Sequence, residues 1–329
     1  MTTKDTWGML LAITIILTGV LASPWNVVTA QEQVIAIAAG GMHTLALTEN
    51  NTVVAWGGTG SFDRGQTLVP EGLNGIVDIA AGHTHSLALR RDGNVFAWGS
   101  FGDDVAFGQT DVPANLARAV AIGAGGGHSM ALLEGGRLVF WGFGTSNISE
   151  VNGIIAIAAG NVHSLALGQN GQVQGWQHRD DADVGQSNVP AGLNNIVAIA
   201  AGGAHSLALT RDGQVIAWGA QSDALNVGQL AVPDGLTDVV DVAAGFFHSL
   251  ALTRNGQVIA WGATASQHDH GQSNVPAGLN DVIDIAAGFF HSVALRRDGS
   301  VVVWGAQSDS VQAGQLDVPN TILDGQRQQ

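Results

Sequence analysis

Short stretches of alternating hydrophobic and polar residues recur along almost the whole chain. The residues from Ala243 to Gly262, AAGFFHSLALTRNGQVIAWG, form most of one unit. Apolar side chains return at every second position within it, a period that indicates β-strands. The pattern predicts three strands in each unit, such as Val239 to Ala244, His248 to Leu252 and Gln257 to Trp261.

A histidine and a tryptophan mark each unit, always 13 residues apart. The units follow one another at steps of 42, 43, 35, 42, 43 and 43 residues. The histidines are His43, His85, His128, His163, His205, His248 and His291. The tryptophans are Trp56, Trp98, Trp141, Trp176, Trp218, Trp261 and Trp304. Seven units of this regularity identify a repeat protein.

Two local signals complete the unit. Asp-Gly or Asn-Gly pairs such as Asp92-Gly93 separate the second and third strands and favour two-residue turns with positive φ at both central positions. A Gly-Gln-x-x-x-Pro segment, such as Gly228 to Pro233, predicts a fourth, shorter strand, because proline is tolerated at a sheet margin.

Four short antiparallel strands repeated every 40 residues or so, about the size given for propeller repeats, are typical of a β-propeller blade. We therefore expect an all-β fold, a single seven-bladed β-propeller of four-stranded antiparallel blades, with repeats starting near residues 34, 76, 119, 154, 196, 239 and 282. An open solenoid is the alternative, but it usually has degenerate capping repeats. Pairing of the last fourth strand, Gln315 to Pro319, with the first strand, Val34 to Gly40, closes the ring in this prediction.

The first 30 residues differ from the repeats. Lys4 precedes an apolar stretch from Met9 to Ala22, and small residues end at Ala30. This pattern predicts a secretory signal peptide cleaved after Ala30, with an uncleaved membrane anchor as the alternative. The expected organisation is a signal peptide at 1–30, the propeller at 31–319 and a C-terminal tail at 320–329, in a secreted or periplasmic protein whose mature form has no membrane segment.

Composition narrows the partners. The chain has 329 residues, no cysteine and a formal net charge of −15, from 12 Lys and Arg against 27 Asp and Glu. Without cysteine it has no disulfide and no thiolate chemistry. A nucleic-acid-binding protein needs a basic surface to contact phosphates, so nucleic acid is excluded as the expected partner. We expect a monomer that binds another protein and holds no cofactor.

The repeats resemble those of the regulator of chromosome condensation family, whose mark is G-x-x-H-[ST]-x-A-L, then D/N-G, W-G and G-Q. The glycines three residues before each histidine carry this mark: Gly40, Gly82, Gly125, Gly160, Gly202, Gly245 and Gly288. The Gly-Gln-x-x-x-Pro ending is similar to the secreted bacterial branch, which includes propellers that inhibit beta-lactamases. The resemblance implies a seven-bladed propeller and makes inhibition of a secreted enzyme an alternative function.

One face of the predicted ring combines aromatic and acidic residues. One side, which we call the long-loop face, holds the turns between first and second strands and the loops after third strands. The other side, the hairpin face, holds the hairpins between second and third strands, with Arg91, Arg211, Arg254 and Arg297. We predict that the long-loop face binds the partner, because variable loops on rigid scaffolds carry function. Its predicted contact residues are Phe246, Phe247, Phe289, Phe290, Asp103, Asp104, Asp180, Asp181, Asp183, Asp223, Asp269 and Asp309. Burial of the four phenylalanines against a neighbouring blade is the alternative for them.

The histidine-hydroxyl pairs of the repeats are interpreted as architectural, because a catalytic constellation is assembled once and not seven times. Four histidines lie outside the series: His83, His178, His268 and His270. The run His268-Asp269-His270 lacks the further ligands of a zinc site, and the run Asp180-Asp181-Ala182-Asp183 lacks the glycine and glutamate of a calcium loop. We therefore predict no metal site.

Two function classes remain. The first is a non-catalytic protein-binding propeller. The second is a propeller enzyme, a lyase or hydrolase, with its site at the central channel, where Asp78, Asp241 and Asp284 break the sevenfold pattern. We favour binding and expect no enzyme, because no catalytic constellation is visible. The third repeat, seven residues short and without Gly-Gln, is interpreted as a simple deletion, with a notch used by a partner as the alternative.

Overall fold

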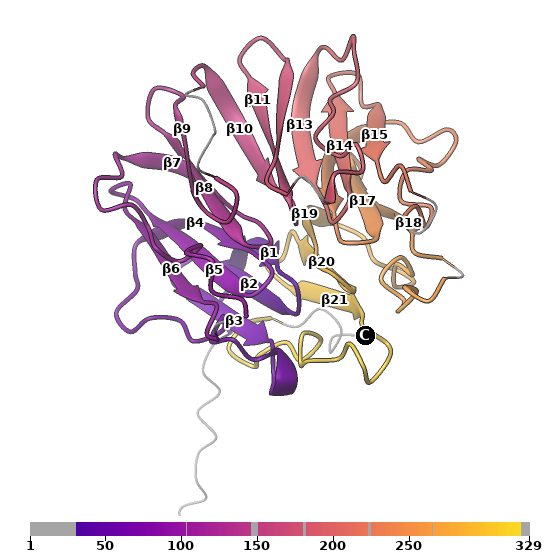
Figure 1. Cartoon of the computed structure of the whole chain (residues 1–329). Coiled ribbons are helices and arrows are strands. Elements are labelled where there is room, and N and C mark those ends of the chain that lie inside the picture. Colours follow the sequence, from indigo (N-terminus) through magenta and orange to yellow (C-terminus); the bar gives the residue numbers. More distant parts are fainter. Residues whose placement is uncertain are drawn as a thin grey trace, which may run out of the picture. The chain divides into compact units, whose positions relative to one another are not determined.

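The computed structural model describes residues 31–102, 104–145, 151–179, 182–222, 225–264 and 266–323. Each repeat forms one antiparallel sheet, and the seven sheets are arranged as the blades of a propeller (Figure 1). We number the blades 1–7 in chain order. The predicted signal peptide and the residues after Leu323 lie outside the described residues.

Each blade has an inner, a middle and an outer strand. The inner strands are β1 (Val34–Ala39), β4 (Ile76–Ala81), β7 (Ala119–Ala124), β10 (Ile154–Ala159), β13 (Ile196–Ala201), β16 (Val239–Ala244) and β19 (Val282–Ala287). The middle strands are β2 (His43–Thr48), β5 (His85–Arg90), β8 (His128–Leu133), β11 (His163–Gly168), β14 (His205–Thr210), β17 (His248–Thr253) and β20 (His291–Arg296). The outer strands are β3 (Val53–Gly57), β6 (Val95–Gly99), β9 (Leu138–Gly142), β12 (Val173–Gln177), β15 (Val215–Gly219), β18 (Val258–Gly262) and β21 (Val301–Gly305). A 3₁₀ turn, η1 (Gly60–Phe62), follows β3.

The predicted fourth strand is wrong. Each described blade has three strands, and the Gly-Gln-x-x-x-Pro segment forms consecutive turns, as where Leu68 N–H donates to the Gly65 carbonyl. The glutamine side chain is used locally: Gln66 accepts from the backbone of Arg64 and donates to the carbonyl of Phe62. Its own carbonyl accepts side-chain hydrogen bonds from the next blade, so this backbone is not available for a strand ladder.

The hairpin turns also differ from the prediction. Gly93 has φ 88°, but Asp92 is not among the non-glycine residues with positive φ. Gly93 N–H donates to the Arg90 carbonyl, which makes a β-turn closed by a left-handed glycine. This is the three-residue hairpin with a glycine bulge, and it needs positive φ at only one position.

Every inner strand contains a β-bulge at its second residue. In blade 1 Val34 lies opposite Thr48 and Ala36 lies opposite Leu47, so Ile35 is the extra residue. The bulge turns an aliphatic side chain toward solvent in all seven blades. These residues, which we call the aliphatic collar, are Ile35, Val77, Val120, Ile155, Val197, Val240 and Ile283.

The hydrophobic core lies between blades. One typical cluster combines Leu207 and Leu209 of blade 5 with Val239, Val242 and Trp261 of blade 6. Leu207 is fully buried, because both faces of a middle strand are covered by neighbouring sheets. The inner strands of all seven blades line a central cavity of about 360 Å³.

A belt of buried hydrogen bonds links each repeated histidine to the next blade. His43 Nε2 lies 3.0 Å from Ser86 Oγ, and the same pairing recurs in every blade. The remaining pairs are His85–Ser129, His128–Ser164, His163–Ser206, His205–Ser249, His248–Ser292 and His291–Thr44. This histidine belt explains the repeated His-Ser motif: the two residues act in different seams, and their role is architectural.

The belt continues to the glutamine carbonyl of the preceding blade. Ser249 Oγ and Trp261 Nε1 both donate to the Gln229 carbonyl, at 3.0 and 2.8 Å. Because the single hydroxyl proton of Ser249 is used there, the bond from His205 must be donated by the Nε2–H of the imidazole. The belt histidines in such seams are therefore neutral with Nδ1 unprotonated, and the Nδ1 of His205 is buried without a donor.

His178 replaces the glutamine that the third repeat lacks. Ser164 Oγ lies 2.8 Å from the Nε2 atoms of both His128 and His178. His128 donates to the hydroxyl and His178 accepts from it, while the Nδ1 of His178 lies 3.3 Å from the Gly144 carbonyl. The deletion is thus compensated within the seam. The possible notch itself, at residues 146–150, lies outside the described residues.

The first and last blades are in contact. His291 bonds Thr44, the Phe289 N–H donates to the Gly41 carbonyl at 3.3 Å, and Trp56 donates to the Gln315 carbonyl at 2.9 Å. Ile322 is fully buried and forms a parallel bridge with Glu32.

Ring closure is tested by a matched pair of substitutions. Trp56→Phe and Trp261→Phe each remove one indole N–H that reaches a glutamine carbonyl, across the seam of blades 7 and 1 or of blades 5 and 6. Each loss is expected to lower the free energy of unfolding by about 1–2 kcal/mol. Urea unfolding measures both values. If Trp261→Phe lowers the free energy of unfolding and Trp56→Phe leaves it unchanged, the ring is open between blades 7 and 1.

Candidate functional site

The central cavity opens on the long-loop face between aromatic side chains. Phe246 of blade 6 and Phe289 of blade 7 line it, and their ring centroids lie 4.4 Å apart in an edge-to-face arrangement. His83 of blade 2 reaches Phe289 from the other side, with centroids 4.4 Å apart. These three residues occupy the turn just before a middle strand in blades 6, 7 and 2, and Gly41 of blade 1 lies between Phe289 and His83.

The other two predicted phenylalanines pack against histidines of the loop after β18. Phe247 is only 6% exposed and stacks on His268 at 3.9 Å. Phe290 packs against His270 at 4.8 Å, and His270 Nδ1 lies 3.0 Å from Ser308 Oγ. His268 and His270 thus serve as packing partners of the aromatic turns. Among the described residues, no group of three or more His, Cys, Asp or Glu is placed to hold a metal ion.

Three further phenylalanines on this face escaped the sequence analysis. Phe101, Phe107 and Phe143 are 62%, 46% and 40% exposed. Phe107 and Phe143 meet edge to face at 5.3 Å, next to Gly127, in the seam of blades 2 and 3. A signal existed in the sequence, since all three residues follow or lie within loops after third strands. They are more accessible than the turn phenylalanines of blades 6 and 7.

The predicted acidic residues divide into three groups. Asp103, Asp180, Asp181 and Asp223 lie outside the described residues. Asp183 and Asp269 each accept the N–H of the glycine two residues later, so these exposed carboxylates also hold their turns. Asp104 pairs with Arg64, and Asp309 is exposed.

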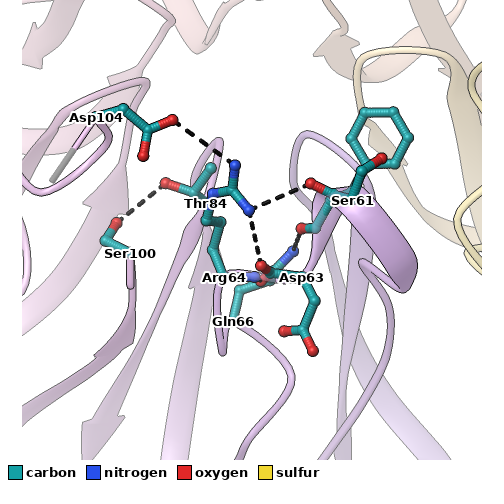
Figure 2. A network of polar contacts seen from close by, with 8 residues as sticks. Ser61, Asp63, Arg64, Gln66, Thr84, Ser100 and Asp104 are labelled. Atoms are coloured by element: carbon teal, nitrogen blue, oxygen red, sulfur yellow. Dashed lines mark hydrogen bonds and ion pairs between the residues drawn. The ribbon is translucent and has the colours of Figure 1, made fainter. Parts of the chain in front are cut away.

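Figure 2 shows how the loop of blade 1 is fixed beside blade 2. The Arg64 guanidinium donates to the carbonyls of Ser61 and Asp63 and lies 3.7 Å from the Asp104 carboxylate. Exposed ion pairs of this kind add little stability, but here the arginine also binds its own loop. Arg64, one of the few basic residues of the long-loop face, is thus already paired with Asp104.

The three aspartates of the inner strands accept hydrogen bonds from backbone N–H groups. Asp78 and Asp241 accept the N–H of the following residue at 2.9 and 2.8 Å, and Asp284 accepts from Ile37 of blade 1 at 3.3 Å. Burial raises the pKa of Asp78 and Asp241 to about 6 and also raises the pKa of Asp284. Their backbone hydrogen bonds give them a structural role in the bulged inner strands.

Comparison with known proteins supports the repeat family. The model of the regulator of chromosome condensation (RCC1) repeat matches residues 34–66, 76–109, 196–224, 239–272 and 282–310. These segments fall in blades 1, 2, 5, 6 and 7. No curated protein sequence matches the chain.

Solved structures show the same fold at low identity. The ectodomain of the receptor kinase CR4 from Physcomitrella patens is 23% identical, with a TM-score of 0.66, over 84% of this chain and 74% of that one. The CRINKLY WD40 ectodomain of receptor kinase ACR4 from Arabidopsis thaliana is 19% identical, with a TM-score of 0.64, over 84% and 99%. Prp20p from Saccharomyces cerevisiae, described with its binding properties to Gsp1p and histones, is 22% identical, with a TM-score of 0.58, over 84% and 82%. In the described part of this chain, no helix has the length and apolar character to cross a membrane.

Proposed function

We propose that this chain is a non-catalytic protein-binding propeller that engages its partner through the long-loop face. The observation that carries the proposal is the exposure of Phe101, Phe107 and Phe143 at the loop ends of a rigid scaffold. Apolar patches rimmed by polar residues typically mark contact surfaces, and aromatic residues are enriched in them. Phe246 and Phe289 extend the surface to the cavity mouth.

The fold and the charge agree with this proposal. Prp20p, which has the same fold, is described as binding Gsp1p and histones. Asp183, Asp269 and Asp309 are exposed in the loops of blades 4, 6 and 7 on the same face and favour a partner with a basic surface. We further propose that the protein acts outside the cytoplasm after cleavage at Ala30, and that a secreted enzyme, such as a beta-lactamase, is one partner to test.

Capture of partners from the organism's own envelope and culture fluid tests the proposal. The wild-type chain is compared with two variants: Phe101→Ala/Phe107→Ala/Phe143→Ala and Phe246→Ala/Phe289→Ala. We expect the first to reduce capture at least tenfold, because each exposed aromatic anchor contributes about 1–2 kcal/mol to a contact of this kind. Arg91→Ala/Arg211→Ala/Arg297→Ala on the hairpin face serves as the matched control.

Three outcomes separate the alternatives. Loss of a partner only with the phenylalanine variants supports the long-loop face, and inhibition assays on that partner then test the inhibitor function. Loss only with the arginine variant contradicts the proposal and moves the site to the hairpin face. Equal capture by all variants also contradicts it, provided that their thermal unfolding matches the wild type.

A further inference from the structure

Blades 2, 6 and 7 share two residues that the other four blades lack. The third residue of their inner strand is an aspartate, and the residue five positions later, at the mouth of the central cavity, is aromatic. In the other four blades alanine holds the first position, as Ala36 and Ala198 do, and glycine or asparagine holds the second. The aspartate and the aromatic ring therefore occur together or not at all. The pairs are Asp78 with His83, Asp241 with Phe246 and Asp284 with Phe289.

The two members of each pair lie at opposite ends of one cavity wall. At the mouth, Phe246, Phe289 and His83 form a continuous arc, with ring centroids 4.4 Å apart at both contacts. Blade 1 lies within this arc, and its Gly41 leaves room for His83, since a Cβ on Gly41 would lie 2.7 Å from the imidazole. The wall of blades 6, 7, 1 and 2 is thus aromatic at the mouth and has the aspartates at its deep end. The wall of blades 3 to 5 carries neither.

The deep end of the cavity has an excess of hydrogen-bond acceptors. Each inner strand has a partner strand on one side only, so alternate residues turn both N–H and C=O toward the axis. The carbonyl oxygens at the deep end therefore face the axis, whereas the aspartates already bond many of the N–H groups beside them. A ligand that enters this end must donate hydrogen bonds. The N–H groups bonded to aspartates are those of Ile37, Ile79, Ile122, Val242 and Ile285.

The charges select a cation among such donors. Burial raises the pKa of Asp78 and Asp241 to about 6, and a cation in the cavity would restore part of the stabilisation that these carboxylates lose with their water. None of the described residues that line the cavity is a lysine or an arginine. Desolvation lowers the pKa of His83, so its ring is neutral at pH 7. The phenyl rings at the mouth attract a cation through their π faces.

We propose that the central cavity binds a primary ammonium group on a linear aliphatic chain, along the wall of blades 6, 7, 1 and 2. The ammonium group donates to the axis-facing carbonyls of Val242 and Ile285, next to the aspartates of the same blades. Ile285 and Phe289 are four residues apart, about 13 Å by the usual rise of a strand, so the group must be carried on a long, narrow chain. The proposal stands whether or not the long-loop face binds a protein.

Isothermal titration calorimetry of the full chain with 1,8-diaminooctane tests the proposal. We expect one saturable site with a Kd below about 1 mM. The neutral analogue 1,8-octanediol is expected to bind at least tenfold more weakly, and octanedioate to give no binding, because the deep end offers acceptors and negative charge. Equal affinity for the diol and the diamine overturns the proposal, as does the absence of saturable diamine binding at millimolar concentrations.

Variants locate the site. Asp241→Asn/Asp284→Asn keeps an oxygen for the backbone N–H groups but removes two charges, and is expected to weaken diamine binding at least tenfold. Asp269→Asn/Asp309→Asn, at exposed positions in the loops of the same blades, changes the net charge equally and is the matched control. Equal weakening by the two variants overturns the proposal, because the attraction is then that of an acidic protein as a whole.

The mouth and the source of the amine are tested separately. Phe246→Ala/Phe289→Ala is expected to weaken diamine binding about threefold or more, and an unchanged Kd overturns the proposed path past these rings. A capped lysine peptide distinguishes two sources of the ammonium group. Binding as tight as that of the diamine assigns the group to a side chain of a partner protein, and weaker binding assigns it to a free amine. Either result supports the site if Asp241→Asn/Asp284→Asn abolishes it.

Discussion

Acidification from pH 7 to about 4 is expected to unfold this protein, because its histidine belt cannot take up protons while folded. Burial lowers the pKa of His43, His85, His163 and His248 from 6.5 to about 3, and that of His205 and His291 to about 4. The pKa of His128 is lowered in the same direction. In the unfolded chain these side chains take up protons below their ordinary pKa of about 6.5, so stability is lost as the pH falls from there.

Three buried carboxyl groups act in the opposite direction. Asp78, Asp241 and Asp284 have raised pKa values, so the folded state binds more protons at these sites and gains stability as the pH falls toward 4. Burial also lowers the pKa of His83 and His178, which adds to the histidine side. The seven belt histidines alone, against three aspartates, leave a net uptake of about four protons on unfolding. That corresponds to a slope of about 5 kcal/mol per pH unit near pH 5. The histidines therefore dominate the pH dependence of the free energy of unfolding. Because domains are commonly stable by only about 5–15 kcal/mol, this slope is large enough to unfold the protein.

Urea unfolding followed by tryptophan fluorescence at several pH values measures this slope. His205→Gln removes one titrating group and is expected to reduce the slope by about one proton, whatever it does to stability at pH 7. The Asp78→Asn variant is the control of opposite sign, and its slope is expected to be steeper than that of the wild type. A free energy of unfolding that is constant between pH 7 and 5 contradicts the proposed protonation of the belt.

Replacement of a belt glycine by alanine is expected to be more damaging than its single methyl group suggests. A Cβ at position 245 overlaps the His248 imidazole and lies 2.6 Å from the Gly288 carbonyl oxygen of the next blade. Relief of this overlap must displace His248 from Ser292, where the two side chains lie 2.8 Å apart in the seam. We expect Gly245→Ala to lower the free energy of unfolding by about 3–5 kcal/mol, from overpacking and a broken buried hydrogen bond.

Gly235 provides the comparison. It has φ +76°, but nothing lies within 4 Å of a Cβ built there. Gly235→Ala therefore carries only the cost of a left-handed alanine, about 1–2 kcal/mol. Thermal and urea unfolding of the two variants give the difference. Equal losses contradict the close-packing explanation, because Gly245, unlike Gly235, does not have a positive φ.

The repeat architecture was predictable because its signals are local. The 13-residue spacing between histidine and tryptophan spans one hairpin, and the two-residue alternation is a property of each strand itself. Strands β16, β17 and β18 accordingly lie where the pattern places them. The fourth strand was not predictable in the same way, because the turn at Gln229 depends on Ser249 and Trp261 in the next blade.

The exposure of the candidate residues was predictable only in part, since it depends on contacts between blades. Phe247 resembles Phe246 in sequence, yet the loop with His268 covers it. Phe107 lies beside Gly127, which holds the turn position that Phe247 occupies in blade 6. The collar was missed for another reason: a bulge leaves the apolar alternation intact while it turns one side chain outward.

The histidine belt also has a temporal consequence. Its first six bonds join residues that are between 36 and 44 positions apart, whereas the bond between Thr44 and His291 spans 247 positions. During synthesis, blades 1 to 6 can therefore assemble in order as they emerge, each on an already folded neighbour. The edge of blade 1 has no partner until blade 7, which begins at Val282, has been made, so the nascent chain carries an open seam through most of its translation. An interrupted chain would expose that seam to other molecules, which makes this protein unusually dependent on completion of its last 40 or so residues, about one repeat.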